Sequence, residues 1–339
     1  MNKTAPIIPC SRDAEHVPAW RRELAAAVTD PRELLALLGL PDEPGCRSGA
    51  ALFGQRVPRG FIARMRPGER HDPLLLQVLP VAQETETLAG FSADPLGEAA
   101  AMATPGLLHK YAGRVLLTLT GACAVHCRYC FRRHYPYADA NPAGSQWMQA
   151  RAYIAAHPDI TEVILSGGDP LSLSDARLAA LAAELTAIPH VQRLRIHSRL
   201  PVVLPERITP ELLAWLGGSR LRPALVIHTN HPREIDAGVA AALRRVATAG
   251  IPLLNQSVLL RGVNDDPDTL CALSEALFAA GALPYYLHQL DPVQGAAHFA
   301  VGDDRARAIL AELRARLPGY LVPRLVREEA GAPGKTPLA

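Results

Sequence analysis

The sequence has few aromatic residues, no marked excess of either charge and no long apolar run. Aromatic side chains make up 5% of the 339 residues, and 35 Lys and Arg stand against 33 Asp and Glu, a net charge of +2. This composition argues against a basic nucleic-acid-binding surface and against an aromatic platform for stacked bases. No segment approaches the ~18 apolar residues of a membrane span, and prolines interrupt the N-terminal stretch where a signal peptide needs an apolar core. We therefore expect a cytoplasmic protein that binds neither nucleic acid nor membranes.

Cysteine is also scarce, but its distribution is uneven. Cys123, Cys127 and Cys130 are three of only six cysteines, and Tyr129 precedes the last of the three. So few cysteines in so long a chain do not form a disulfide scaffold. Three thiolates on one short loop can bind three irons of a 4Fe-4S cluster and leave the fourth iron open to a small molecule. A zinc site completed by His126 or His134 is the alternative.

Short runs rich in leucine and β-branched residues recur along the chain. They lie at 114–120, 163–168, 193–198, 224–230, 252–260 and 283–291, and from the second run onward their starts are 30, 31, 28 and 31 residues apart. Helix-like segments separate them, as at 174–187, 233–249 and 267–280. This rhythm predicts βαβ units and a parallel sheet. Six units are too few for a complete eight-stranded barrel, and periodicity alone does not separate a partial barrel from a doubly wound sheet.

The two ends of the chain lack this rhythm. Residues 1–105 predict a helical N-terminal extension, with helices at 19–28 and 31–38, ahead of an α/β core at 106–320. Residues 321–339 form a separate C-terminal segment, and its last part, 328–339, has the Gly- and Pro-rich composition of a disordered tail around a single lysine, Lys335.

Polar residues follow five of the six predicted strands. They lie at 123–130, 166–169, 197–199, 228–231 and 291. The carboxyl ends of parallel strands carry the chemistry of most α/β enzymes, so we expect these residues to share one active-site face.

At this point the sequence resembles the radical S-adenosylmethionine (SAM) superfamily. In that superfamily a Cys-x3-Cys-x2-Cys loop with an aromatic residue before the last cysteine holds the cluster, and its open iron binds SAM. The segment Ser166-Gly167-Gly168-Asp169 resembles the glycine motif that holds the SAM amino group. The resemblance implies a partial (β/α)6 barrel and places His197 and Gln256 on the SAM-facing wall.

Over residues 90–339 the sequence resembles, more narrowly, the lysine 2,3-aminomutase family. The resemblance is carried by RLPVVLPERIT (199–209), HTNHPREI (228–235), NQSVLLRGVND (255–265) and GAPGKTP (331–337). It implies pyridoxal 5′-phosphate (PLP) on Lys335, with Lys110 and Arg114 at its phosphate. It also implies that Arg132 binds the substrate carboxylate, and that Asp291 pairs with the distal ammonium of L-lysine. Glu328, where the family has an aspartate, is the second such carboxylate.

The implied activity is an isomerase reaction that converts L-α-lysine into β-lysine with a 5′-deoxyadenosyl radical. Only four residues follow Lys335, and short members of this kind resemble the bacterial enzymes that supply (R)-β-lysine to elongation factor P, which a separate ligase modifies. Flavodoxin or ferredoxin is the expected electron donor. A free metabolic lysine or glutamate 2,3-aminomutase remains an alternative. A zinc-bound interaction module is the alternative from a different class.

Overall fold

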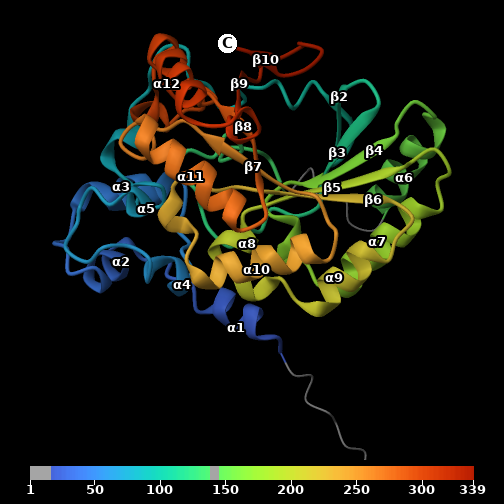
Figure 1. Ribbon diagram of the computed structural model, residues 1–339, viewed down its shortest axis with the longest axis horizontal. Coiled ribbons are helices and arrows are strands. Elements are labelled where there is room, and N and C mark those ends of the chain that lie inside the picture. The colour runs from blue at the N-terminus through green and yellow to red at the C-terminus, as the bar shows by residue number, and fades with distance from the viewer. Residues whose placement is uncertain (1–16, 138–144) are drawn as a thin grey trace, which may run out of the picture.

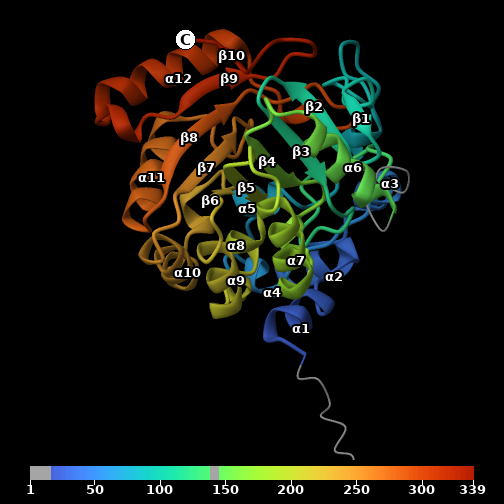
Figure 2. The ribbon, with the colours of Figure 1, turned by 90° about the vertical axis from the view of Figure 1, so that its right-hand side faces the viewer.

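The computed structural model describes residues 17–137 and 145–339, so residues 1–16 of the predicted extension lie outside it. Ten strands form one sheet in which each strand pairs with its neighbours in sequence order (Figures 1 and 2). Their bounds are β1 (Met102–Thr104), β2 (Leu107–Tyr111), β3 (Arg114–Thr118), β4 (Glu162–Ser166), β5 (Arg193–Ser198), β6 (Arg222–Ile227), β7 (Leu253–Val258), β8 (Leu283–His288), β9 (Arg324–Arg327) and β10 (Thr336–Pro337).

The six predicted strands are confirmed as β3 to β8, and all pair in parallel. The sequence rhythm missed four further strands. An antiparallel pair, β1 and β2, precedes β3, and β1 begins before the boundary expected at residue 105. At the other edge β9 adds a seventh parallel strand and β10 pairs antiparallel with it. The sheet therefore has two separate edges, β1 and β10, and does not close, in agreement with the partial barrel that the family resemblance implies.

Helices cover the outer side of the parallel strands (Figure 2). They are α6 (Ser145–Ala156), α7 (Asp175–Thr186), α8 (Leu200–Val203), α9 (Pro210–Gly217), α10 (Ala237–Thr248), α11 (Pro267–Ala279) and α12 (Asp303–Arg316). Short 3₁₀ turns lie between them, at η2 (Pro170–Ser172), η3 (Pro205–Arg207), η4 (Pro232–Glu234) and η5 (Ala297–Phe299), and η6 (Gly319–Leu321) follows α12. The side chains of Ser174, Thr209, Asp236 and Asp266 cap α7, α9, α10 and α11 by accepting a backbone N–H.

Alternation along each strand separates the core from the cavity. On β4, Val163 and Leu165 are buried in the core cluster, whereas Ile164 lines the cavity. On β5, Leu194 and Ile196 belong to the core, and the residues between and after them face the cavity. Successive side chains of a strand point to opposite faces, so the strands pack on the helices with one face and build the site with the other.

The N-terminal helices support the loop that follows β3. Their bounds are α1 (Ala19–Ala25), α2 (Pro31–Leu37), α3 (Pro44–Leu52), α4 (Arg59–Ile62) and α5 (Pro73–Leu76), followed by η1 (Ala82–Thr85). Arg128, in the cysteine loop, is fully buried and donates through Nε to Glu84 Oε1 at 2.8 Å. Its backbone N–H donates to the Gln77 carbonyl at 2.9 Å. The extension therefore fixes the position of the cysteines. In the described part of the chain, no helix has the length and apolar character needed to cross a membrane.

The C-terminal segment is ordered, which corrects the disorder expected from its composition. Thr336 and Pro337 pair with Arg327 and Val326, and the Leu338 N–H donates to the Leu325 carbonyl at 3.1 Å. This pairing satisfies backbone groups that composition does not take into account. It also brings residue 335 back beside residue 328.

Candidate active site

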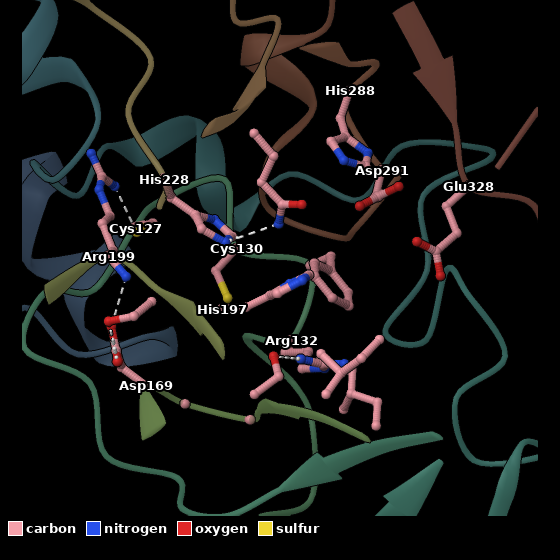
Figure 3. A pocket seen from close by; sticks show the side chains of 18 of the residues that line it. Cys127, Cys130, Arg132, Asp169, His197, Arg199, His228, His288, Asp291 and Glu328 are labelled. Carbon is pink, nitrogen blue, oxygen red and sulfur yellow. Dashed lines mark hydrogen bonds between the residues drawn. The ribbon is translucent and has the colours of Figure 1, made fainter. Parts of the chain in front are cut away.

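A single cavity of about 540 Å³ lies between the inner face of the sheet and the loops at its carboxyl edge (Figure 3). It is lined by side chains from all six predicted strands, among them Leu116, Ile164, Arg195, Ala224, Leu254 and Tyr286. Every candidate site residue derived from the sequence also lines it: Lys110, Arg114, Cys123, Cys127, Cys130, Arg132, Ser166, Gly167, Gly168, Asp169, His197, Gln256, Asp291, Glu328 and Lys335. The structure thus brings together residues spread over more than 200 positions of the sequence.

At one end of the cavity lie the three thiols. Burial, followed by the proximity of Cys130, places the pKa of Cys123 well above its usual range. Burial and the neighbouring Cys127 raise the pKa of Cys130 to about 11. Among the described residues, no three His, Cys, Asp or Glu side chains are arranged to hold a single metal ion. The three thiols fit a cluster, because its iron supplies the positive charge that neighbouring, partly buried thiolates require.

The glycine turn after β4 is locked to the base of the cysteine loop. Gly167 has φ +118°, and a Cβ on Gly168 would lie 2.4 Å from the Ala122 carbonyl oxygen. The N–H of Gly168 donates to the Thr120 carbonyl at 2.6 Å, and that of Asp169 to the Ala122 carbonyl at 2.8 Å. These N–H groups are in use, and the Asp169 carbonyl accepts from the Ser172 N–H at 3.0 Å and from Ser172 Oγ at 2.7 Å. Within the described part of the chain, the carbonyl of Gly168 is therefore the backbone group that these two residues have left to offer. Carbonyls are the partners that an amino group, a donor, requires.

The Asp169 carboxylate stabilises this turn through four hydrogen bonds. Its carboxylate accepts hydrogen bonds from Ser198 Oγ at 2.7 Å and from the backbone N–H groups of Leu171, Arg199 and Leu200 at 3.0, 2.8 and 3.1 Å. These bonds occupy both oxygens, so Asp169 ties the end of β4 to the end of β5.

The inner face of β5 to β7 carries neutral imidazoles. Burial, and then Arg195, holds the pKa of His197 well below its usual range. Burial, and then Arg199, lowers the pKa of His228 to about 3. His228 Nε2 lies 2.9 Å from Gln256 Nε2. The expected SAM-facing wall is therefore polar but uncharged at neutral pH.

A chain of alternating charges crosses the cavity from Arg132 to Lys335. Glu98 accepts from Arg132 Nε and Nη2 at 2.7 and 2.8 Å, and its Oε1 lies 3.1 Å from Lys110 Nζ. Lys110 Nζ also donates to Glu328 Oε1 at 3.0 Å, and Lys335 Nζ donates to Glu328 Oε2 at 2.7 Å. Glu98 uses Nε and Nη2 of Arg132, so the remaining nitrogen, Nη1, is directed away from Glu98. Nη1 donates to Ser166 Oγ at 3.1 Å.

The pKa values of two carboxylates near Lys335, those of Glu328 and Asp291, are shifted in opposite directions. Burial opposes ionisation of Glu328, but the two lysines outweigh it and hold its pKa well below the usual range. Burial, followed by the Glu328 carboxylate, raises the pKa of Asp291 to about 7. Asp291 Oδ1 and His288 Nε2 are buried and have no hydrogen-bond partner among the described residues. Such unpartnered polar atoms fit a cavity that takes a polar ligand at this end.

Arg114, on β3, lies over the Tyr111 ring at 4.6 Å. Lys110 lies on β2, a strand that the sequence rhythm did not predict. A guanidinium and an ammonium on the same wall suit a phosphate dianion, and Lys335 supplies the amine that PLP requires. The described residues therefore fit PLP as well as the cluster.

The sequence reasoning missed Glu98, and it placed Arg199 at the expected active-site face without giving it a role. Glu98 is buried, yet it is a single acid in the segment 96–101 with no motif around it. Arg199 begins the segment 199–209 that carries part of the resemblance, and this was the signal available for it. The two histidines considered for zinc contact backbone carbonyls: His126 Nδ1 lies 2.9 Å from the Gly54 oxygen and His134 Nε2 lies 3.2 Å from that of Gln294.

Residues 117–273 match the family model described as the radical SAM superfamily. Together with the open parallel sheet, the cysteine loop and the glycine turn, this match defines the protein as a radical SAM enzyme.

The relatives narrow this class. The chain is 53% identical to an L-lysine 2,3-aminomutase of Escherichia coli and 52% identical to one of Haemophilus influenzae, with 94% of each chain covered in both comparisons. It is 37% identical to an L-lysine 2,3-aminomutase of Clostridium subterminale, covering 94% of this chain and 77% of that one. The chain belongs to the lysine 2,3-aminomutase family, as the motifs predicted, and the alternative of a zinc-bound interaction module is set aside.

Proposed function

We propose that the protein converts L-α-lysine into β-lysine by moving the amino group from C2 to C3. One observation carries the proposal: a single cavity joins a loop of three thiols to a lysine on the opposite wall, with two carboxylates beside that lysine (Figure 3). The two ends meet the requirements of different cofactors, and a small substrate between them can reach both.

Cys123, Cys127 and Cys130 would hold a 4Fe-4S cluster, and Lys335 would hold PLP. When bound, the cluster with SAM supplies the 5′-deoxyadenosyl radical that takes hydrogen from C3, and PLP holds the migrating nitrogen. The carbonyl edge of the glycine turn, His197 and Gln256 would position SAM. Lys110 and Arg114 would hold the PLP phosphate.

The remaining residues would orient lysine. Arg132 would bind the substrate carboxylate through Nη1, the nitrogen that Glu98 does not use and that donates to Ser166 Oγ. Asp291 and Glu328 would receive the distal ammonium. The second carboxylate of glutamate would meet these two acids in place of an ammonium, so the charges favour lysine over the glutamate alternative.

We further propose that the product is (R)-β-lysine and that a separate ligase attaches it to elongation factor P in the cytoplasm, with flavodoxin or ferredoxin as the electron donor. The resemblance to short family members supports this proposal, as does the mutual 94% coverage with the E. coli relative. Removing the protein from cells should leave elongation factor P without the β-lysyl mass increment, and added (R)-β-lysine should restore it. An unchanged mass would leave the enzyme as a free lysine aminomutase.

The activity itself is tested with the anaerobically reconstituted protein. Incubation with L-lysine, SAM, PLP and dithionite should yield β-lysine by mass spectrometry after chiral derivatisation. Product from glutamate but not from lysine would contradict the proposed substrate.

A further inference from the structure

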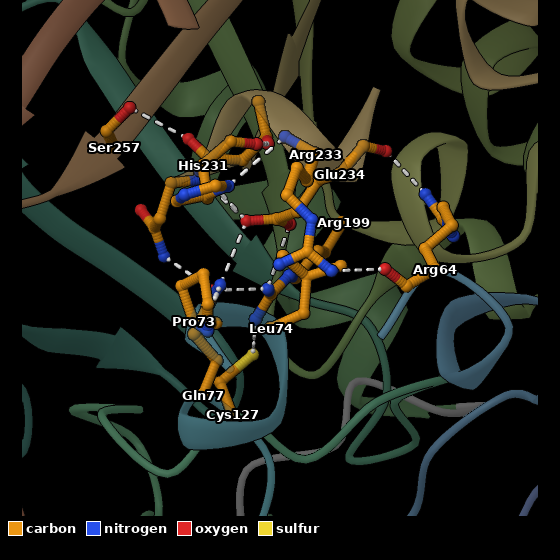
Figure 4. Close-up of polar contacts among 12 residues, drawn as sticks. Arg64, Pro73, Leu74, Gln77, Cys127, Arg199, His231, Arg233, Glu234 and Ser257 are labelled. Carbon is orange, nitrogen blue, oxygen red and sulfur yellow. Dashed lines mark hydrogen bonds and ion pairs between the residues drawn. The ribbon is translucent and has the colours of Figure 1, made fainter. Parts of the chain in front are cut away.

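Arg199 reaches from the end of β5 to the cysteine loop (Figure 4). Its Nη1 donates to Cys127 Sγ at 2.7 Å and to Tyr129 Oη at 2.7 Å, and the residue is only 6% exposed. A charged donor in contact with a ligand sulfur makes a charge-assisted hydrogen bond, and the burial of Arg199 leaves little water to weaken it.

The surroundings hold Arg199 firmly in this position. Its backbone N–H donates to Asp169 Oδ2 at 2.8 Å, and its Nη2 donates to Gln77 Oε1 at 2.7 Å and to Glu234 Oε2 at 3.1 Å. Glu234 is fully buried and is held in turn by the Asn230 N–H at 2.9 Å. The glycine motif and the segments 199–209 and 228–235, which carried the family resemblance, therefore converge on one thiol.

This arrangement is specific to Arg199. The neighbouring buried arginines of the cysteine loop, Arg128 and Arg133, are directed to the Glu84 carboxylate. Arg207 is equally buried and pairs with Asp175 at 2.9 Å. These residues show that a buried arginine can be satisfied in this protein by an acid and carbonyl groups alone.

We propose that Arg199 is a positioning residue that sets the reduction potential of the cluster through its hydrogen bond to Cys127. One-electron reduction places additional negative charge on the cluster and its sulfur ligands, and a cationic donor stabilises that charge. Arg199 therefore makes the cluster easier to reduce. Glu234 limits the effect because it places a negative charge on the same guanidinium. The inference rests on the proposed function, since it requires the cluster at Cys123, Cys127 and Cys130.

The test is a redox titration of the reconstituted full chain, followed by electron paramagnetic resonance in the absence of SAM and lysine. Arg199→Gln should shift the reduction equilibrium at least tenfold toward the oxidised cluster, which is about 59 mV for a one-electron couple. Arg199→Lys, which keeps the charge but not the planar fork, should lie between this variant and the unmodified protein. Glu234→Gln should shift the potential in the opposite direction.

Arg207→Lys is the matched control, because it alters an equally buried arginine that touches no cysteine; its potential should equal that of the unmodified protein. Equal potentials for Arg199→Gln and the unmodified protein would overturn the proposal, as would equal shifts in Arg199→Lys and Arg207→Lys. If Arg199→Gln does not retain iron, Arg199→Lys and Glu234→Gln provide the test. The proposal predicts that these two variants shift the reduction potential in opposite directions, and shifts of the same sign would overturn the proposal. Absence of any cluster from the unmodified protein would instead contradict the proposed function.

Discussion

Replacing Asp291 by asparagine should strengthen the ligand-free fold and weaken lysine binding at the same time. Burial, and then Glu328, raise the pKa of this carboxyl from 3.8 to about 7, so between these values the folded protein holds a proton that the unfolded chain has released. Stability therefore falls as the pH rises through this window. At about 1.4 kcal/mol per pH unit the penalty is roughly 2 kcal/mol at pH 5 and roughly 4 kcal/mol at pH 8.

Asparagine carries no charge and removes this penalty. Urea unfolding of the cofactor-free protein should therefore show a gain in the free energy of unfolding for Asp291→Asn that is about twice as large at pH 8 as at pH 5. Asp304→Asn is the control, because Asp304 is fully exposed on α12 and its replacement should change little at either pH.

Lysine binding should respond in the opposite direction. Removal of one partner from a buried charge pair costs about 2–5 kcal/mol, so the dissociation constant for lysine at pH 8 should rise at least about 30-fold. In the unmodified protein the affinity should increase with pH up to about 7, as Asp291 ionises, and then level off. Calorimetry of the PLP-loaded protein without SAM measures both effects. A variant that is less stable at pH 8, or that binds lysine as tightly as the unmodified protein, would refute this reasoning.

Three further experiments, two substitutions and one chemical trapping reaction, test other parts of the site. Cys127→Ala should lower the iron content and abolish SAM cleavage, whereas Cys271→Ala, on helix α11 outside the cavity, should retain both in an iron assay and a 5′-deoxyadenosine assay. Borohydride reduction should trap the pyridoxyl group on Lys335 in a peptide map, and a label found only elsewhere would reassign the PLP residue. Gly168→Ala places a Cβ 2.4 Å from a backbone oxygen and should lower both the melting temperature and the iron content, while Gly217→Ala, with nothing within 4 Å, should leave both unchanged.

The sequence predicted the elements whose signal is local. Strands β3 to β8 each carry an apolar run, and the cysteine loop carries its chemistry in its spacing. Strand β9 has only four residues, with arginine at both ends, and β10 is a Thr-Pro pair. These strands form because their backbone groups pair with those of a neighbouring strand. Amino-acid composition contains no signal for such pairing.

The same limit applies to the site. The contact between Glu98 and Arg132 joins residues 34 positions apart and depends on how the segment before β1 packs against the cysteine loop. Asp169 lines the cavity, but nothing in the sequence shows that four donors already occupy its carboxylate. Pattern and resemblance selected residues that line one cavity, whereas their hydrogen-bond partners became visible only in the fold.

The central claim, that this cavity moves the α-amino group of lysine to the neighbouring carbon, is tested most directly with L-lysine labelled with ¹⁵N at the α-amino group. After anaerobic turnover with SAM, PLP and dithionite, nuclear magnetic resonance of the product should show the label on C3 of β-lysine. Label that stays on C2, in a protein that carries its cluster and PLP and cleaves SAM, would contradict the account.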